Sequence, residues 1–124
     1  MPTPSIIDLG QVSQPVTDLE KSVAFYRDVV GLRFLFSAPP GLAFFMIGGV
    51  RLMLSTPEGV ETGPSTSVLY FRVPQIDEAW AKILGKADLH DGPHLVAKLP
   101  DHELWMAFFK DPDGNLLAFM EERR

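Results

Sequence analysis

The chain has 124 residues, of which 46% are hydrophobic, 16 are acidic and 11 are Lys or Arg, so its formal net charge is −5. That size suits one packed domain, or two small modules that share a core. The acidic balance argues against nucleic acid as a partner, because nucleic-acid binding requires a basic face. Cysteine is absent, which excludes disulfides and thiolate chemistry.

Neither a membrane segment nor a signal peptide is predicted. No apolar run approaches the ~20 residues that are needed to span a bilayer. The N-terminal residues lack the basic segment and apolar core of a secretory signal. We therefore expect a cytoplasmic protein without a membrane partner.

The first half of the sequence predicts a strand, a helix and three further strands. The helix should begin after Asp18, whose side chain can accept backbone N–H groups of the first turn, and end at Gly31, which enters the left-handed region without strain. Its apolar residues recur on a 3.6-residue period and form one stripe. The strands are expected at residues 6–16, 32–36, 42–47 and 51–55.

The second half predicts the same order of elements. Residues 57–67 are rich in Pro, Gly, Ser and Thr and should link the two halves. A helix is expected near residues 75–86, with turns at 91–93 and 111–114 where Pro and Gly favour bends. The strands are expected at residues 68–73, 95–99, 104–109 and 116–120. The predicted plan is a single domain made of module 1 (6–56), a linker (57–67) and module 2 (68–121).

Aligning the sequence with itself supports two copies of one unit. Residues 16–20 align with residues 73–77, and both segments lead into a helix pattern. Residues 49–54 likewise align with residues 114–119. The second alignment is shifted further along the chain than the first, as a longer loop in the second copy would require. Each copy is therefore predicted to be a βαβββ unit.

Three segments together carry a family resemblance: Val16-x-Asp18-Leu19-Glu20-x-Ser22-x-x-Phe25-Tyr26, Gly31-Leu32, and Phe109-x-Asp111-Pro112-Asp113-Gly114-Asn115. They resemble the vicinal oxygen chelate superfamily, which includes glyoxalases, bleomycin resistance proteins and extradiol dioxygenases, and the resemblance covers about residues 6 to 121. It implies an α+β fold of two βαβββ modules, whose mixed, curled sheets surround a shared cavity that a dimer partner often completes.

Enzymes of this superfamily hold a divalent metal on four strand positions. The resemblance places these positions at Gln11, Met53, Val68 and Ala118, and the internal repeat pairs Gln11 with Val68 and Met53 with Ala118. Gln11 alone could bind a metal, because thioether, isopropyl and methyl groups offer no hard donor. We therefore expect no metal and no other cofactor, with a divalent metal on displaced ligands as the alternative.

Alternation along the strands predicts which side chains share the inner face, because residues i and i+2 lie on one side of a sheet. The predicted ligand-binding residues are Gln11, Ser13, Arg51, Met53, Tyr70, Arg72, Trp105 and Ala118. A mostly apolar wall with a few polar groups suits an amphipathic or aromatic small molecule with an anionic or carbonyl oxygen. The arginines could equally be paired with Glu at strand ends, and the aromatic residues could belong to the core.

Four polar side chains receive no role from the sequence. Gln14 falls on the helix-facing side, where the superfamily carries an aliphatic residue. His90 and His94 flank a predicted turn, where they fix no metal geometry, and His102 falls in a hairpin turn that should be solvated.

Two classes of function remain open, and no catalytic residue is assigned. The first is a metal-free protein, similar to the bleomycin-resistance branch, that sequesters or senses a small molecule. The second is a glyoxalase, epimerase or dioxygenase-type enzyme, as a lyase or isomerase that works without metal or through displaced ligands. The missing donors favour the first class, since a fold alone does not fix a function. A homodimer is expected, because so small a two-module chain leaves apolar strand surface to be covered.

Overall fold

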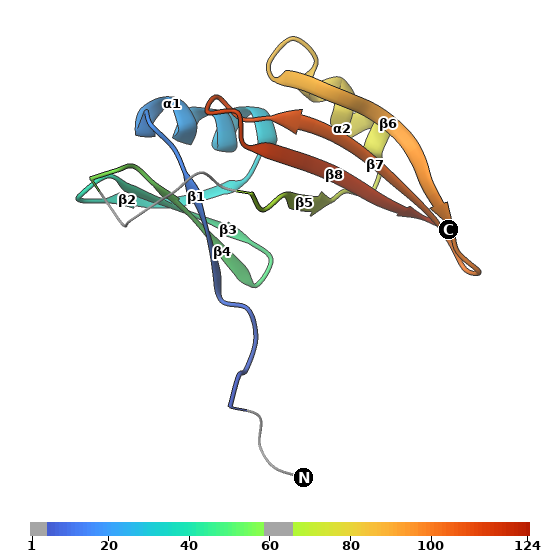
Figure 1. Ribbon diagram of the computed structural model, residues 1–124, viewed down its shortest axis with the longest axis horizontal. Helices are drawn as coiled ribbons and strands as arrows, with labels where there is room; N and C mark the ends of the chain where they lie inside the picture. Colours follow the sequence, from blue (N-terminus) through green and yellow to red (C-terminus); the bar gives the residue numbers. More distant parts are fainter. Residues whose placement is uncertain (1–4, 59–65) are drawn as a thin grey trace.

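The computed structural model describes residues 5–58 and 66–124, which form two four-stranded sheets with helices packed against them (Figure 1). The first half contains β1 (Gln11–Pro15), α1 (Leu19–Ala24), the π-helical segment η1 (Phe25–Val30), β2 (Arg33–Ala38), β3 (Leu42–Ile47) and β4 (Val50–Ser55). The second half contains β5 (Leu69–Arg72), α2 (Ile76–Ile83), β6 (Asp88–Lys98), β7 (Glu103–Lys110) and β8 (Leu116–Arg123). This order confirms the predicted α+β fold of two βαβββ units.

Both sheets have the same strand order and register. The first sheet runs β1-β4-β3-β2 and the second runs β5-β8-β7-β6. In each sheet the first pair is parallel and the other neighbours are antiparallel. Ser13 pairs with Met53 in the first sheet, and Tyr70 pairs with Ala118 in the second. The alignment of the two halves in the sequence places Ser13 over Tyr70 and Met53 over Ala118, so the internal repeat extends to the strand register.

The helix of the first half begins and ends where its capping residues predict. Asp18 Oδ1 accepts the backbone N–H of Lys21 at 3.1 Å. The helix changes from α1 to η1 at Phe25, whose N–H is shared between the carbonyls of Lys21 and Ser22. Gly31 ends it in the left-handed region, with a φ of 89°. The expected single α-helix is therefore a short α-helix that continues as a π-helix.

The first strand is shorter than predicted. Only residues from Gln11 onward pair with β4, whereas residues 5–10 lie outside the sheet, and Ile7 is 93% exposed. The reason is the length of the partner strand. β4 begins at Val50, so residues before Gly10 have no neighbouring strand with which to pair.

The turn predicted at residues 91–93 is wrong, because this segment belongs to β6. The strand follows β7 along its whole length, with irregular register between Leu89 and His94. β6 lies at the edge of the second sheet, where the missing N–H of Pro93 can face away from the ladder. His94 consequently lies in a strand opposite Met106, and not in a loop.

The helix-facing sides of both sheets contribute to one apolar core. α1 packs on β3 and β4, and α2 packs on β6, β7 and β8. The buried residues include Phe45, Leu52 and Leu54 from the first sheet and Phe109, Leu117 and Phe119 from the second. This arrangement confirms the alternation that the strands predict, with apolar side chains under the helices and mixed side chains on the open faces.

A buried polar network joins the two halves at Asp111, in the turn between β7 and β8. The Tyr26 hydroxyl donates to Asp111 Oδ2 at 2.7 Å, and Gln14 Nε2 donates to the same hydroxyl oxygen at 3.5 Å. Burial and the Asp111 carboxylate raise the pKa of Tyr26, which keeps it a neutral donor. Asn115 Nδ2 donates to Asp111 Oδ2 and to the Pro15 carbonyl, each at 2.8 Å. Gln14 is thus explained as a satisfied polar group at this junction.

No helix within residues 5–58 and 66–124 has the length and apolar character of a membrane span. Most of the predicted linker, residues 59–65, lies outside the described residues, so the boundary between the modules stays a prediction.

Candidate functional site

The open face of the first sheet, opposite α1, carries half of the predicted ligand-binding residues. Strand pairing places one row of residues across four strands, namely Gln11, Arg51, Met46 and Arg33. The next row on the same side consists of Ser13, Met53, Phe44 and Phe36. Directly paired residues project from the same side of a sheet. These eight residues are referred to below as the arginine face.

Two neighbours on the arginine face hold Arg51 in place. Its Nε donates to Gln11 Oε1 at 2.7 Å, and its guanidinium carbon lies 5.2 Å from the centre of the Phe44 ring. A guanidinium at this distance from an aromatic ring makes a favourable cation–π contact. Gln11 Nε2 in turn reaches the sulfur of Met53 at 3.8 Å. Arg51 is therefore exposed to solvent but oriented by the sheet beneath it.

The four positions that hold a metal in the resembled enzymes do not fit one here. Met53 and Ala118 are buried and offer a thioether and a methyl group, and Val68 offers an isopropyl group. Gln11 has an amide oxygen, but that oxygen accepts the hydrogen bond from Arg51, whose positive charge would repel a cation. Hard divalent metals require oxygen or imidazole ligands. The described part of the chain also contains no cluster of three or more His, Cys, Asp or Glu side chains that could hold a metal ion.

The open face of the second sheet is aromatic, and its arginine is paired. Tyr70 is 47% exposed, and its ring stands edge-on to Phe108 with 6.0 Å between the ring centres. Phe108 lies directly opposite Ala118 in the neighbouring strand. Arg72 Nε lies 3.1 Å from Glu122 Oε1, so its charge is compensated. This face therefore offers apolar and aromatic surface with little net charge.

The structure separates the predicted site residues into two groups and leaves one apart. The arginine face brings together Gln11, Ser13, Arg51 and Met53, and the second open face brings together Tyr70, Arg72 and Ala118. Trp105 lies on the opposite, helix-facing side of the second sheet, where the guanidinium of Arg123 lies 4.3 Å from its ring centre. The structure does not bring Trp105 together with the other predicted residues.

Sequence reasoning missed four members of the arginine face, namely Arg33, Phe36, Phe44 and Met46. In β2 the register shifts between Phe34 and Phe36, so Arg33 and Phe36 share a side although an odd number of steps along the chain separates them. Counting in steps of two assigns them to opposite sides, and a bulge leaves no simple signal in the sequence. Phe44 and Met46 do follow strict alternation. Applying the same count to β3 as to β4 would have found both residues.

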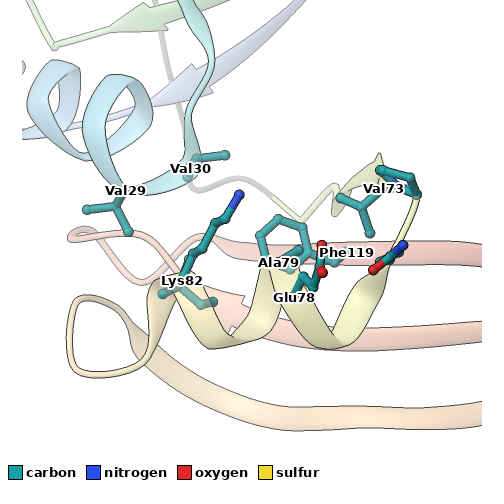
Figure 2. Close-up of a pocket in the computed structure, with 10 residues that line it drawn as sticks. Val29, Val30, Val73, Glu78, Ala79, Lys82 and Phe119 are labelled. Carbon is teal, nitrogen blue, oxygen red and sulfur yellow. The ribbon is translucent and has the colours of Figure 1, made fainter.

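Two hollows lie where the halves of the molecule meet. The first, of about 400 Å³, lies between the β3–β4 turn and β5, and its lining includes Tyr70 and Arg72. The second, of about 220 Å³, lies between η1 and α2. Figure 2 shows its largely apolar walls, including Val30, with Glu78 and Lys82 projecting from α2. The second hollow contains none of the predicted site residues, so it does not enlarge the candidate site.

The model of the Glyoxalase/Bleomycin resistance protein/Dioxygenase superfamily matches residues 8–119. This match covers most of the chain, and the repeated βαβββ topology agrees with it. The protein therefore belongs to this superfamily, which confirms the resemblance found in the sequence.

Solved structures with the same fold include binding proteins and enzymes. TnmS3, an antibiotic binding protein from Streptomyces sp. CB03234, is 24% identical with a TM-score of 0.75, and the match covers 97% of this chain and 99% of that one. A lactoylglutathione lyase from Agrobacterium tumefaciens is 23% identical with a TM-score of 0.68, covering 96% and 95%. A glyoxalase/bleomycin resistance protein/dioxygenase family enzyme from Burkholderia phytofirmans PsJN is 21% identical with a TM-score of 0.76, covering 93% and 98%. Similarity at this level shows the fold alone, so function has to be argued from the residues of this chain.

Proposed function

We propose that this protein binds an amphipathic or aromatic small molecule without a metal, in a sequestering or resistance-type role. The observation that carries the proposal is the replacement of the metal ligands. Three of the four positions hold Met53, Val68 and Ala118, and Gln11 at the fourth is bonded to Arg51. Chemistry that relies on a Lewis acid has no ligand set at these positions.

The two open faces supply what a small-molecule site requires, namely apolar walls with a few polar groups that fix orientation. Phe36 and Tyr70 each leave 47% of their surface exposed, so aromatic area is available on both faces. A binding role also has a precedent on this scaffold in TnmS3, an antibiotic binding protein.

A lyase or isomerase is the second candidate function, and the fold shared with lactoylglutathione lyase supports considering it. Such a reaction needs an acid or base within reach of the ligand. The eight residues of the arginine face include no His, Asp or Glu. The second open face carries His94, whose ring is stacked on Phe108 with 6.2 Å between ring centres. Asp91 lies directly opposite Phe108 on the same face, so catalysis on this chain would be sought at His94 and Asp91.

Metal analysis separates the metal-free proposal from a metalloenzyme. Purified protein is exposed to Zn, Ni, Mn or Fe, dialysed, and analysed for elemental content, and we expect no stoichiometric metal. One equivalent of metal that disappears in Gln11→Ala would overturn the proposal. Ligand binding is measured separately, by thermal shift with a panel of amphipathic compounds with and without a chelator, because a ligand of the native state raises the melting temperature.

We also propose that the chain forms a homodimer, in which a second copy covers the apolar segment before β1. The segment before β1 supports this, since its apolar residues are 64–93% exposed, namely Ile6, Ile7 and Leu9. Contiguous apolar surface of this kind is usually covered by a partner, and a two-fold interface is self-complementary. Sedimentation equilibrium should give twice the chain mass of 13.8 kDa. A single-chain mass throughout the micromolar range would contradict the dimer.

A further inference from the structure

We infer that the arginine face recognises an oxyanion carried on a planar aromatic ring, such as an aromatic carboxylate or sulfonate, and that Arg51 binds this negatively charged group. The inference rests on the proposed function, because it names the ligand class of that binding site. It is carried by one arrangement of side chains: Arg51 is fixed between Gln11 and Phe44, and the ring of Phe44 packs against the exposed ring of Phe36.

The distribution of ion pairs singles out this face. The sequence contains six arginines, and four of them lie within ion-pair distance of a carboxylate, namely Arg27, Arg72, Arg123 and Arg124. Arg33 and Arg51 have no such partner among the described residues, and both lie on the arginine face. No member of that face is acidic. A chain with a net charge of −5 thus keeps two uncompensated positive charges on one open surface, which favours an anionic ligand.

The contacts of Arg51 leave it able to bind an oxyanion. A guanidinium has five N–H donors, and within residues 5–58 and 66–124 only the one on Nε is used, by Gln11. The two terminal amino groups therefore remain for the paired hydrogen bonds that arginine makes with carboxylates and similar oxyanions. Gln11 acts as a positioning residue. At the position where related enzymes place a metal ligand, this chain has a side chain that orients an arginine.

The neighbouring row provides a surface for the ring of the ligand. The rings of Phe36 and Phe44 lie 4.7 Å apart with an interplanar angle of 32°. Phe44 is largely covered, whereas Phe36 is exposed and can stack on an aromatic ligand. Phe36 and Arg51 lie on strands separated by β3, which places their backbones at least about 10 Å apart. The long arginine side chain and a ligand of one or two rings can bridge that separation.

The test uses two fluorescent ligands that share a skeleton and differ in one oxyanion, 8-anilinonaphthalene-1-sulfonate and N-phenyl-1-naphthylamine. Affinities are measured by fluorescence titration of the wild type and Arg51→Met, whose side chain keeps an unbranched apolar stem without the charge. We expect Arg51→Met to weaken sulfonate binding roughly tenfold or more, as the loss of charge-assisted hydrogen bonds implies. Binding of the neutral amine should weaken by less than about threefold. Circular dichroism and the melting temperature verify that each variant is folded.

Two further variants control for net charge and test the positioning role. Arg27→Met makes the same change in η1, outside both open faces, where the arginine is already paired with Asp28, and should alter sulfonate affinity by less than about twofold. Gln11→Leu removes the bond that orients Arg51 and leaves the charge in place. We expect it to weaken sulfonate binding about three- to tenfold while amine binding is nearly unchanged. A purely structural role of Gln11 would weaken both ligands equally.

Four results would overturn the inference. Equal losses of affinity for the two ligands in Arg51→Met would mean that Arg51 shapes the surface but does not recognise the charge of the ligand. A loss in Arg27→Met as large as that in Arg51→Met would mean that net charge alone attracts the sulfonate. Binding of the amine but not the sulfonate by the wild type would also contradict the inference, while the proposed metal-free binding function would stand. Binding of neither ligand overturns the inference as well, and uptake of one equivalent of metal would then remove the proposed function too.

Discussion

The open faces of the two sheets share a strand order and a register, yet they differ in charge. On the first face, the partner of Arg51 is the neutral amide of Gln11. On the second face, Arg72 is paired with the carboxylate of Glu122, which also lies 3.5 Å from His102. The repeat therefore determines the side of the sheet from which side chains project, but not their charge. One scaffold holds a cationic face and a compensated face, and we assign anion recognition to the first.

The helix-facing sides of the sheets differ in a related way. Gln14 and Tyr26 in the first half occupy the same places in the repeat as Phe71 and Ile83 in the second. In the first pair, Gln14 donates to the Tyr26 hydroxyl, which donates to Asp111 across the junction. The second pair is apolar and packs in the core. Buried polar groups need specific partners, while apolar groups need only neighbours of suitable shape. The stability of the first half should therefore depend more strongly on Asp111 than the stability of the second half depends on any single residue.

Removing Asp111 should give the largest effect of all. Asp111→Ala deletes the acceptor of the buried Tyr26 hydroxyl and of the Asn115 side chain. The unsatisfied buried hydroxyl of Tyr26 costs about 1–3 kcal/mol, and the part-buried backbone N–H groups of Asp113 and Asn115 also lose their acceptor, so the free energy of unfolding should fall by about 2–4 kcal/mol. Urea unfolding measures the change. Asp113→Ala is the matched control in the same turn, because Asp113 accepts from Thr17 at an exposed position and its loss should cost less than about 1 kcal/mol. Equal costs for the two variants would contradict the importance of the buried network.

Introducing a carboxylate into the arginine face should make it resemble the second face. Met46 lies between Arg33 and Arg51 in one row of the first sheet, so Met46→Glu would place a negative charge beside both arginines. We expect the affinity for 8-anilinonaphthalene-1-sulfonate to fall about tenfold or more, which corresponds to at least roughly 1.4 kcal/mol. Met46→Gln has a similar size without the charge and should change the affinity by less than about threefold. A similar loss in both variants would show that shape, and not charge, controls binding at this face.

The acid dependence of stability tests a carboxylate of the second half. Arg123 and the backbone N–H of Ile76 hold the pKa of Glu121 below its ordinary value of 4.5. A carboxylate with a lowered native pKa stabilises fully above its unfolded pKa, and this contribution disappears as the pH falls through the native value. Glu121→Gln should therefore lower the free energy of unfolding by about 1 kcal/mol at pH 7, and the difference from the wild type should shrink below about pH 4. Urea unfolding at several pH values measures this. A difference that does not change with pH would assign the effect to hydrogen-bond geometry alone.

Local signals account for what the sequence predicts well. The cap at Asp18, the stop at Gly31 and the turn at 111–114 are short-range features, and together with periodicity they give the fold and the repeat. The side chains that complete the candidate site depend on features that short-range patterns do not encode. The bulge in β2 hides the shared side of Arg33 and Phe36. The role of Gln14 depends on its bond to Tyr26, whose hydroxyl is held by Asp111 in the other half.

The smallest expected effect comes from freeing the arginine of the second face. Glu122→Gln removes the partner of Arg72, whose side chain is 68% exposed, so the stability should change by less than about 1 kcal/mol. In the Arg51→Met background, the first face no longer binds the charged group of the ligand. In that background, Glu122→Gln should raise sulfonate affinity only about two- to threefold. The gain should be small because no described residue orients the freed arginine as Gln11 orients Arg51. Fluorescence titration of the single and double variants measures it. A gain as large as the loss caused by Arg51→Met would contradict the role of Gln11, because a free charge alone would then be sufficient for binding.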